Sequence, residues 1–372
     1  MNSSTDNVML ATDRCGVLAI DLGALGENYR RLAKNVAPAA LAAVVKADAY
    51  GLGAVQVSQR LYQEGSRTFF VAHFIEAVQL RPSLPQDAAI YVLNGLQPGN
   101  EERAAALGVV PLLNSIGQIK AWSQTAGRVG RTLEAALQVD SGMSRLGLSP
   151  DEVCELLANP GLISNIEVTT LVSHLACADE PANPANARQL AALRAISTAF
   201  PSLPVSLANS GGIFLGGEFH GSLARPGIAL YGGAPISDRD NPMLPVVWLE
   251  VPVIQTRTVS PGTQIGYGGT FTAKTSTRLA TIAAGYADGL PRSLSGRGAV
   301  YFEGQRLPIA GRVSMDSITV DISALPEGAL DLGTPVEVVG KHQTLEMMAA
   351  DADTISYEIL TRLGHRYQRR YI

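Results

Sequence analysis

The chain has 372 residues, of which 46% are hydrophobic and 17% are charged, and its formal net charge is −4. This length accommodates two domains of ordinary size, and the composition is that of a packed globular protein, not of a disordered chain. The slightly negative charge and the lack of a Lys- and Arg-rich run exclude nucleic acid as an expected partner.

The first segment of the chain, Met1–Arg14, is polar and contains aspartates, so it lacks the apolar core of a secretory signal. No apolar stretch reaches the roughly 18 residues that a membrane span needs. The three cysteines are too few and too scattered for a disulfide framework or a zinc site, so we expect free thiols and no metal. We therefore expect a soluble, cytoplasmic protein that has no membrane partner.

The next part of the chain alternates short apolar runs with amphipathic, alanine-rich segments. Strands that are buried on both faces, as in parallel sheets, have such continuous apolar runs. Eight strands are expected, at Leu41–Val45, Thr68–Ala72, Ala89–Leu93, Val109–Leu113, Leu133–Val139, Val168–Ser173, Pro204–Ala208 and Ser222–Ala224. Helices are expected between them, for example at Ala54–Glu64, Pro98–Leu107, Ser115–Thr125, Asp151–Ala158 and Ala185–Phe200. This alternation favours a TIM-type barrel. A doubly wound sheet is the alternative, although no Gly-x-Gly-x-x-Gly motif follows the first strand.

The composition changes at Gly232–Pro245, which is rich in Gly, Pro and Asp and is typical of a linker. Strand-like runs separated by Gly and Pro turns follow, at Val246–Thr258, Thr277–Ala284, Ala299–Phe302, Leu307–Ile309, Ser317–Ile322 and Thr334–Val339. One short helix is expected at Leu345–Ala350, before the C-terminal segment Thr354–Gly364. The sequence therefore predicts an α/β barrel domain at residues 17–236 and a smaller, mostly-β domain at residues 237–372.

Several polar residues end the barrel strands, which is where TIM barrels place their chemistry. In chain order they are Lys46, His73, Asn94, Asn114, Asp140 with Arg145, His174, Asn209 with Ser210, and Arg225. Lys46 follows a strongly apolar strand, and desolvation there lowers the pKa of a lysine and favours its nucleophilic neutral form. Taken alone, such a lysine more often extends its amine to solvent.

Glycine-rich loops follow the last two barrel strands, at Asn209–Gly212 and Arg225–Ile228. These are the usual barrel positions of a phosphate site built from backbone N–H groups, although turns also favour glycine. A lysine that faces a phosphate site across the mouth of a barrel is the arrangement that pyridoxal phosphate requires.

Ordered motifs run along nearly the whole chain, from about Val17 to the end. Residues 43–53 read Ala-Val-Val-Lys-Ala-Asp-Ala-Tyr-Gly-Leu-Gly. Further motifs are Val139–Gly147, Ser173–Ala176, Ala208–Gly211, Arg225–Gly232, Gly266–Phe271, Gly285–Gly289, Gly311–Asp316 and Ile355–Leu360. Together they resemble the motifs of the alanine racemase family, which implies an isomerase with a barrel and a β domain. The resemblance also implies that a strand near residues 17–20 joins the β domain and that the helix Leu22–Asn35 precedes the first barrel strand.

The resemblance implies pyridoxal 5'-phosphate as cofactor and two bases on opposite faces of the substrate. Lys46 is similar to the lysine that carries the cofactor and serves the D-isomer, and Tyr267 to the base for the L-isomer. His174 and Arg225 are implied behind this tyrosine, and Arg225 is also implied to face the pyridine nitrogen. Because Lys46 and Tyr267 lie in different domains, and family members share active sites between subunits, a homodimer is implied.

Other site residues are carried over by the same motifs. The residues that match cofactor-binding positions are Tyr50, Asn209, Ser210, Gly227, Ile228 and Tyr357. Arg145 and the backbone of Met315 are implied to bind the substrate carboxylate, and Asp316 to lie near the tyrosine face. Many family members have a carbamylated lysine where this chain has Gln138. An amide brings no negative charge, but it could still hold Arg145, alone or with an anion such as chloride.

The family implies that the enzyme supplies D-alanine for peptidoglycan, but other functions remain open. A racemase for serine or for a broader set of amino acids would have the same core motifs. A decarboxylase on a similar barrel would not need two bases, and the motif around Tyr267 argues against it. A non-catalytic pyridoxal-phosphate carrier resembles the barrel alone, and the β domain with Tyr267 and Met315 argues against that reading.

Overall fold

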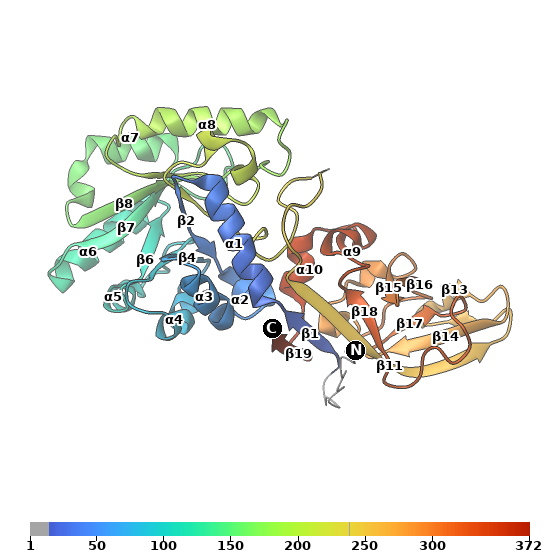
Figure 1. Cartoon of the computed structure of the whole chain (residues 1–372). Helices are drawn as coiled ribbons and strands as arrows, with labels where there is room; N and C mark the ends of the chain where they lie inside the picture. Colours follow the sequence, from blue (N-terminus) through green and yellow to red (C-terminus); the bar gives the residue numbers. More distant parts are fainter. Residues whose placement is uncertain (1–14, 238) are drawn as a thin grey trace, which may run out of the picture. The chain divides into compact units, whose positions relative to one another are not determined.

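The computed structural model describes residues 15–237 and 239–372 (Figure 1). The chain divides into two compact units. Leu22–Val246 forms the first, which we call the barrel unit. The described residues up to Asp21, together with Val247–Ile372, form the second, which we call the β unit.

The barrel unit is built on seven parallel strands that pair in chain order. They are β3 (Ala43–Val44), β4 (Thr68–Val71), β5 (Ala89–Val92), β6 (Val110–Leu113), β7 (Leu133–Gln138), β8 (Ile166–Val172) and β9 (Val205–Ser206). All four residues of β6 are buried, as expected for a strand that is covered on both faces.

Backbone hydrogen bonds close this ladder into a barrel. β10 (Leu223–Ala224) pairs in parallel with β2 (Ala40–Leu41), which precedes β3. On one side of β10 the Arg225 N–H donates to the Ala208 carbonyl at 2.8 Å, and on the other the Val44 N–H donates to the Pro226 carbonyl at 3.1 Å. All eight strands expected from the sequence are present, so the predicted barrel is confirmed and the doubly wound alternative is wrong.

Helices precede the first barrel strand and follow most of the others. They are α1 (Leu22–Val36), α2 (Lys46–Gly51), α3 (Ala54–Gln63), α4 (Phe74–Leu80), α5 (Glu101–Ala106), α6 (Ile116–Val129), α7 (Pro150–Ala158) and α8 (Pro184–Ser197), with short 3-10 turns η1 (Arg81–Ser83), η2 (Pro160–Ile163), η3 (Gly212–Phe214) and η4 (Gly217–Phe219). The sequence before α7 sets its start, because the Ser149 side chain accepts from the Glu152 N–H at 3.2 Å and the Glu152 carboxylate accepts from the Ser149 N–H at 3.1 Å.

The β unit is organised around the long strand β11 (Val247–Val259). This strand pairs antiparallel with β1 (Val17–Ile20), β14 (Thr277–Ile282) and β18 (Pro335–Val339). The remaining strands are β12 (Gln264–Ile265), β13 (Phe271–Thr272), β15 (Ala299–Phe302), β16 (Gln305–Pro308), β17 (Ile318–Asp321) and β19 (Gln368–Tyr371). β19 lies beside β1 in parallel, so the two ends of the described chain share one sheet edge.

Two helices complete the β unit, α9 (Leu345–Ala352) and α10 (Ser356–Arg362), together with the 3-10 turns η5 (Tyr267–Gly269), η6 (Tyr286–Asp288) and η7 (Arg292–Leu294). The sequence predicted only the first of these helices. The second forms inside the C-terminal segment, where the buried Ile359 and Leu360 fix one face of a short helix. The mostly-β character of this part of the chain is confirmed.

Three negative findings apply to the described residues. None of their helices is both long enough and apolar enough to cross a membrane. Within the same ranges, no group of three or more His, Cys, Asp or Glu side chains is arranged to hold a metal ion. The thiols of Cys15, Cys154 and Cys177 are free.

Candidate active site

Lys46 lies at the carboxyl end of the first barrel strand, where β3 passes into α2. The preceding residue, Val45, donates its N–H to the Phe70 carbonyl of β4 at 2.8 Å, which fixes the strand end. Burial lowers the pKa of Lys46, the charges of Arg145 and Arg225 lower it further, and the Glu76 carboxylate acts in the opposite direction. The lysine is therefore biased toward its neutral, nucleophilic form.

A left-handed turn follows Lys46 directly. Ala47, Asp48, Ala49 and Tyr50 have φ values between 52° and 57°. Residues with a Cβ atom pay about 1–2 kcal/mol each for this conformation, so surrounding contacts must hold it in place. The Asp48 carboxylate provides one of them, because it accepts from the Ala54 N–H at the start of α3 at 2.7 Å.

The left-handed turn brings Tyr50 to the loop after β10. A Cβ atom built on Gly227 would lie 2.1 Å from the Tyr50 hydroxyl oxygen, so only glycine lets the backbone pass under this hydroxyl. The Ser210 hydroxyl accepts from the N–H groups of Gly227 at 2.9 Å and Ala229 at 3.3 Å, which leaves its own proton free to donate. Ile228 between them is fully buried. Two hydroxyls and a glycine loop thus form a small polar cradle that suits a phosphate.

Arg225 and His174 form a buried polar pair at the same end of the barrel. The Arg225 guanidinium is only 4% exposed and donates to the Ser173 carbonyl at 2.7 Å, to the Ser206 hydroxyl and to His174 Nδ1 at 3.4 Å. Burial lowers the pKa of Arg225 to about 10, so it stays charged at neutral pH. Burial, followed by the charges of Arg225 and Arg145, lowers the pKa of His174 to about 3, so this imidazole is neutral.

Asn209 shapes a loop beside this pair. Its side-chain oxygen accepts from the Gly212 N–H at 2.9 Å, and its amide group donates to the Leu175 carbonyl at 3.4 Å. Both contacts are internal to the barrel loops. They make Asn209 a residue that fixes the backbone after β9, next to Ser210 of the cradle.

Arg145 lies on the loop between β7 and α7, and its side chain is exposed. The Asp140 carboxylate holds this loop by accepting from the N–H groups of Gly142 at 2.8 Å, Met143 at 2.9 Å and Ser144 at 3.1 Å. Gln138 ends β7 and is buried. Within the described ranges no hydrogen bond joins the side chains of Gln138 and Arg145.

The sequence-predicted residues of the β unit form a second, separate group. Tyr267 begins η5 and is 71% exposed, Met315 is 52% exposed, and Tyr357 on α10 is 41% exposed. The Met315 carbonyl accepts from the Ala287 N–H at 3.0 Å. All three side chains are therefore accessible in the described chain.

Asp316 belongs to an ionic network in the same unit. The Arg366 guanidinium donates to Asp316 at 2.7 Å and, with its other nitrogens, to both oxygens of the fully buried Asp288. One Asp288 oxygen also accepts from the Gly285 N–H at 2.9 Å. These contacts anchor the two loops that end in Met315 and begin at Gly285.

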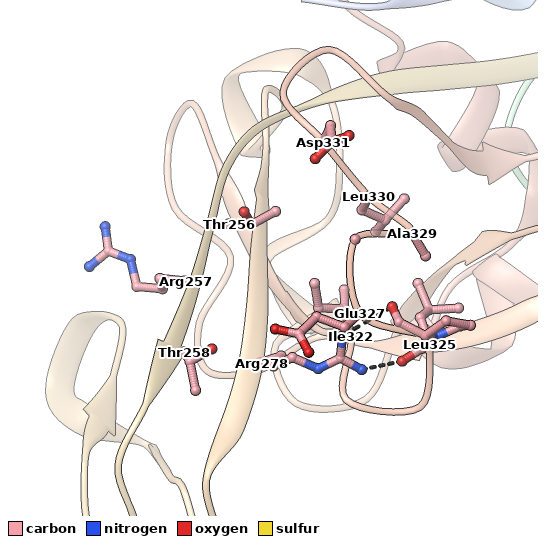
Figure 2. A pocket seen from close by; sticks show the side chains of 12 residues that line it. Thr256, Arg257, Thr258, Arg278, Ile322, Leu325, Glu327, Ala329, Leu330 and Asp331 are labelled. Atoms are coloured by element: carbon pink, nitrogen blue, oxygen red, sulfur yellow. Dashed lines mark hydrogen bonds between the residues drawn. The ribbon is translucent and has the colours of Figure 1, made fainter.

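A pocket of about 180 Å³ lies elsewhere in the β unit, between β11, β14 and the loop 322–331 (Figure 2). Its most prominent charged group, Arg278, donates to the backbone carbonyls of Ser323 at 3.1 Å, Pro326 at 3.0 Å and Leu325. The guanidinium is thus occupied in holding the loop.

Glu76 is a contributor to this site that the sequence analysis did not single out, whereas Asp140 was named there among the residues that end barrel strands. Both act on backbone N–H groups of loops that adopt positive φ values. Glu76 follows His73 by the spacing of a helix-capping carboxylate, which is the one sequence signal that could have identified it. That signal indicates only the start of α4. It does not predict the contact of Glu76 with the N–H of Ala47, in the loop after β3.

Two family models match this chain. The one described as "Alanine racemase, N-terminal domain" matches residues 20–235, and the one described as "Alanine racemase, C-terminal domain" matches residues 246–371. A protein of Agrobacterium fabrum named "Alanine racemase, catabolic" is 61% identical over 357 residues, which is 96% of this chain and 92% of the relative. A protein of Rhizobium johnstonii with the same name is 59% identical over 369 residues, which is 99% of this chain and 98% of the relative.

A solved structure is also similar. It is described as the crystal structure of alanine racemase from Bartonella henselae with covalently bound pyridoxal phosphate. Its TM-score is 0.93 and its sequence identity is 46%, and the alignment covers 96% of this chain and 99% of that one.

Proposed function

The chain belongs to the alanine racemase family, and on this premise we propose that it interconverts L-alanine and D-alanine with pyridoxal 5'-phosphate as cofactor. The observation that carries the proposal is the arrangement of the barrel mouth. A lysine with a lowered pKa, Lys46, directly precedes the left-handed turn that carries Tyr50, whose hydroxyl lies over Gly227 of the polar cradle. A similar structure described with covalently bound pyridoxal phosphate supports this cofactor.

The residues of the barrel unit fit pyridoxal phosphate. The Tyr50 and Ser210 hydroxyls and the loop at Gly227 would hold its phosphate, and Lys46 would bond to its aldehyde carbon. Arg225 would face the pyridine nitrogen, and because it remains protonated at neutral pH it cannot give that nitrogen a proton. When bound, the cofactor acidifies the α-hydrogen of an amino acid by delocalising the electrons left behind.

Racemisation then needs one base on each face of the α-carbon. The neutral amine of Lys46 can accept the α-proton of D-alanine, and its conjugate acid can return a proton to the same face. Tyr267 would act on the opposite face. Arg145 and the backbone at Met315 would hold the substrate carboxylate.

We also propose that the enzyme is a homodimer in which Tyr267 of one subunit completes the barrel mouth of the other. The exposure of Tyr267, Met315 and Tyr357 in the β unit supports this assembly, because isolated proteins rarely leave such side chains in solvent together. A symmetric dimer would form two equivalent sites of this kind.

The names of the relatives bear on the physiological role. Two relatives at 61% and 59% identity are named catabolic. They favour alanine breakdown over the supply of D-alanine for peptidoglycan that the family resemblance implied. Growth of a deletion strain on D- or L-alanine as carbon source, compared with its need for added D-alanine, separates the two roles. A cytoplasmic location remains a prediction from the sequence.

The test of the reaction uses the purified holoenzyme and measures optical rotation with L-alanine, D-alanine, L-serine and L-lysine. We expect alanine to be racemised fastest. Lys46→Ala should abolish both activity and the visible absorbance of the lysine-bound cofactor, whereas Tyr267→Phe should abolish activity and keep the absorbance. Lys120→Ala and Tyr62→Phe are matched controls, because both side chains are on the barrel surface and pair with Glu155 and Asp87. Full activity in Lys46→Ala would refute the mechanism.

A further inference from the structure

The Glu76 carboxylate joins the loops that follow two neighbouring barrel strands. One oxygen accepts from the N–H of Ala47, the residue after Lys46. The other accepts from the N–H groups of Ala72 and His73, each at 2.8 Å, where β4 passes into α4. Three backbone donors from the mouth of the barrel thus converge on a single side chain.

The contact to Ala47 falls where the backbone most needs support. Ala47 is the first residue of the left-handed turn, and each of the four residues in this turn would be more stable in a right-handed conformation. At one end of the turn stands Lys46, and at its other end stands Tyr50. Release of Ala47 would let the turn relax and would displace the base and the cradle hydroxyl together.

We propose that Glu76 is a positioning residue of the racemase, which holds Lys46 and Tyr50 in register by anchoring the left-handed turn between them. The proposal rests on the proposed function, since it assigns a role within the same site. Glu76 does not touch the substrate or the cofactor in this scheme and acts only through the turn and through its charge.

The charge of Glu76 gives the proposal a second, independent consequence. The groups that act on the charge of Lys46 are Arg145 and Arg225, which lower its pKa, and Glu76, which raises it. His174, the other titratable group that interacts with the lysine, is neutral. Removal of the negative charge at position 76 should therefore lower the pKa of the Lys46 amine.

Two substitutions separate position from charge. Glu76→Asp keeps the charge but is one methylene too short to reach both loops, and Glu76→Gln keeps the length but loses the charge and turns one acceptor into a donor. We expect kcat for alanine to fall about tenfold or more in both variants, since small misplacements of a catalytic group cost that much. The apparent affinity for pyridoxal phosphate, from titration of the cofactor-depleted enzyme, should fall with it.

The pH profile distinguishes the two variants. With D-alanine as substrate, Lys46 must be neutral to accept the proton, so kcat falls on the acid side as the lysine becomes protonated. We expect this acid limb to move to lower pH in Glu76→Gln and to stay in place in Glu76→Asp. If Glu76 had only a structural role, its replacement by Gln would not shift the acid limb of the pH profile.

Glu152 offers a matched control. It caps α7 as Glu76 caps α4, and it also bridges to a neighbouring element, because it accepts from the N–H groups of Ser149 and of Ile116 at the start of α6, each at 3.1 Å. Glu152→Gln and Glu152→Asp should lose thermal stability to a similar degree but keep kcat, cofactor affinity and the acid limb.

The proposal is overturned if the Glu76 variants lose only as much stability as the Glu152 variants and retain wild-type kcat and cofactor affinity. An acid limb that stays in place in Glu76→Gln overturns the electrostatic part even if that variant is unstable. A wild-type enzyme that binds pyridoxal phosphate but racemises no amino acid refutes the proposed function instead, and the cofactor affinities of the variants then still test the anchoring of Tyr50.

Discussion

His174 is held as a neutral imidazole, because burial and the charges of Arg225 and Arg145 lower its pKa to about 3. An unfolded histidine has a pKa near 6.5. Between these values only the unfolded chain binds this proton, so the contribution of His174 to the free energy of unfolding decreases as the pH falls. Above about pH 7.5 neither state is protonated there, and the contribution no longer changes.

We therefore predict that His174→Gln makes the stability of the holoenzyme less sensitive to acid. The measurement is chemical denaturation at about pH 7.5 and about pH 5. The wild type should lose more free energy of unfolding between these values than the variant does. Equal losses would mean that His174 is protonated in the folded protein. His365→Gln serves as the control, because this histidine is exposed.

At the scale of single residues, the sequence identified those that end strands. Lys46 and Arg225 were predictable because a charged residue follows directly on an apolar run, and the barrel then fixes which edge it occupies. Asp140 also ends a strand and was identified in this way, but Glu76 was not predictable as a site residue, because its role depends on which backbone N–H groups turn toward it. That direction depends on positive φ values at residues such as Ala47, where the residue type gives no hint of them.

Among the elements, the loop from β7 to α7 has the clearest functional dependence on one side chain. Burial alone would raise the pKa of Asp140, but three backbone N–H groups of the loop lower it overall, so the carboxylate is charged while it caps the loop. The loop closes on itself because the N–H of Leu148 donates to the Gln138 carbonyl at 2.8 Å. Arg145 thus depends on Asp140 for its position.

We predict that Asp140→Asn raises KM for alanine about tenfold, because an amide accepts fewer of these hydrogen bonds and carries no charge. The affinity for pyridoxal phosphate should change little, since the cradle lies on other loops. Steady-state kinetics and a cofactor titration measure the two effects. Asp151→Asn, on the exposed first turn of α7, is the control, and an unchanged KM in Asp140→Asn would contradict the assigned role.

The sequence predicted the positions of the barrel strands better than those of the short helices. The strands β3 to β8 were expected within a few residues of their observed bounds, because most of their residues are apolar and buried. α4 was not among the helices named from the sequence, since its seven residues are too few for a helical pattern to stand out. The left-handed conformation of the turn in α2 could not be predicted from the sequence, because alanine normally favours the right-handed helix.

At the scale of the whole molecule, the two proposed bases, Lys46 and Tyr267, belong to separate units. The proposed dimer therefore predicts how much activity is recovered when two inactive variants are mixed. In a heterodimer of Lys46→Ala and Tyr267→Phe subunits, one site combines the intact Lys46 with the intact Tyr267 of the partner, and the other site lacks both. Random pairing gives heterodimers in about half of the dimers, so co-refolded inactive variants should recover about a quarter of the wild-type activity.

Activity is measured after the two variants are unfolded and refolded together, and each variant refolded alone is the control. No recovery in the mixture, while sedimentation shows that dimers have formed, would contradict a shared site.

The sequence predicted the presence of both units from their different periodicities. The pairing of their residues across subunits came only from the family resemblance, because apolar periodicity describes contacts within a chain.

The closure of the barrel orders events during synthesis of the protein. Lys46 and Tyr50 leave the ribosome early, but Gly227 and Ser210, which complete the cradle, lie near the other end of the barrel unit. The first and last barrel strands must meet before the cradle exists, and contacts between such distant segments form slowly. A nascent chain therefore contains Lys46 well before it can retain a phosphate or bury this lysine enough to lower its pKa, and cofactor capture would mark the moment at which the barrel closes.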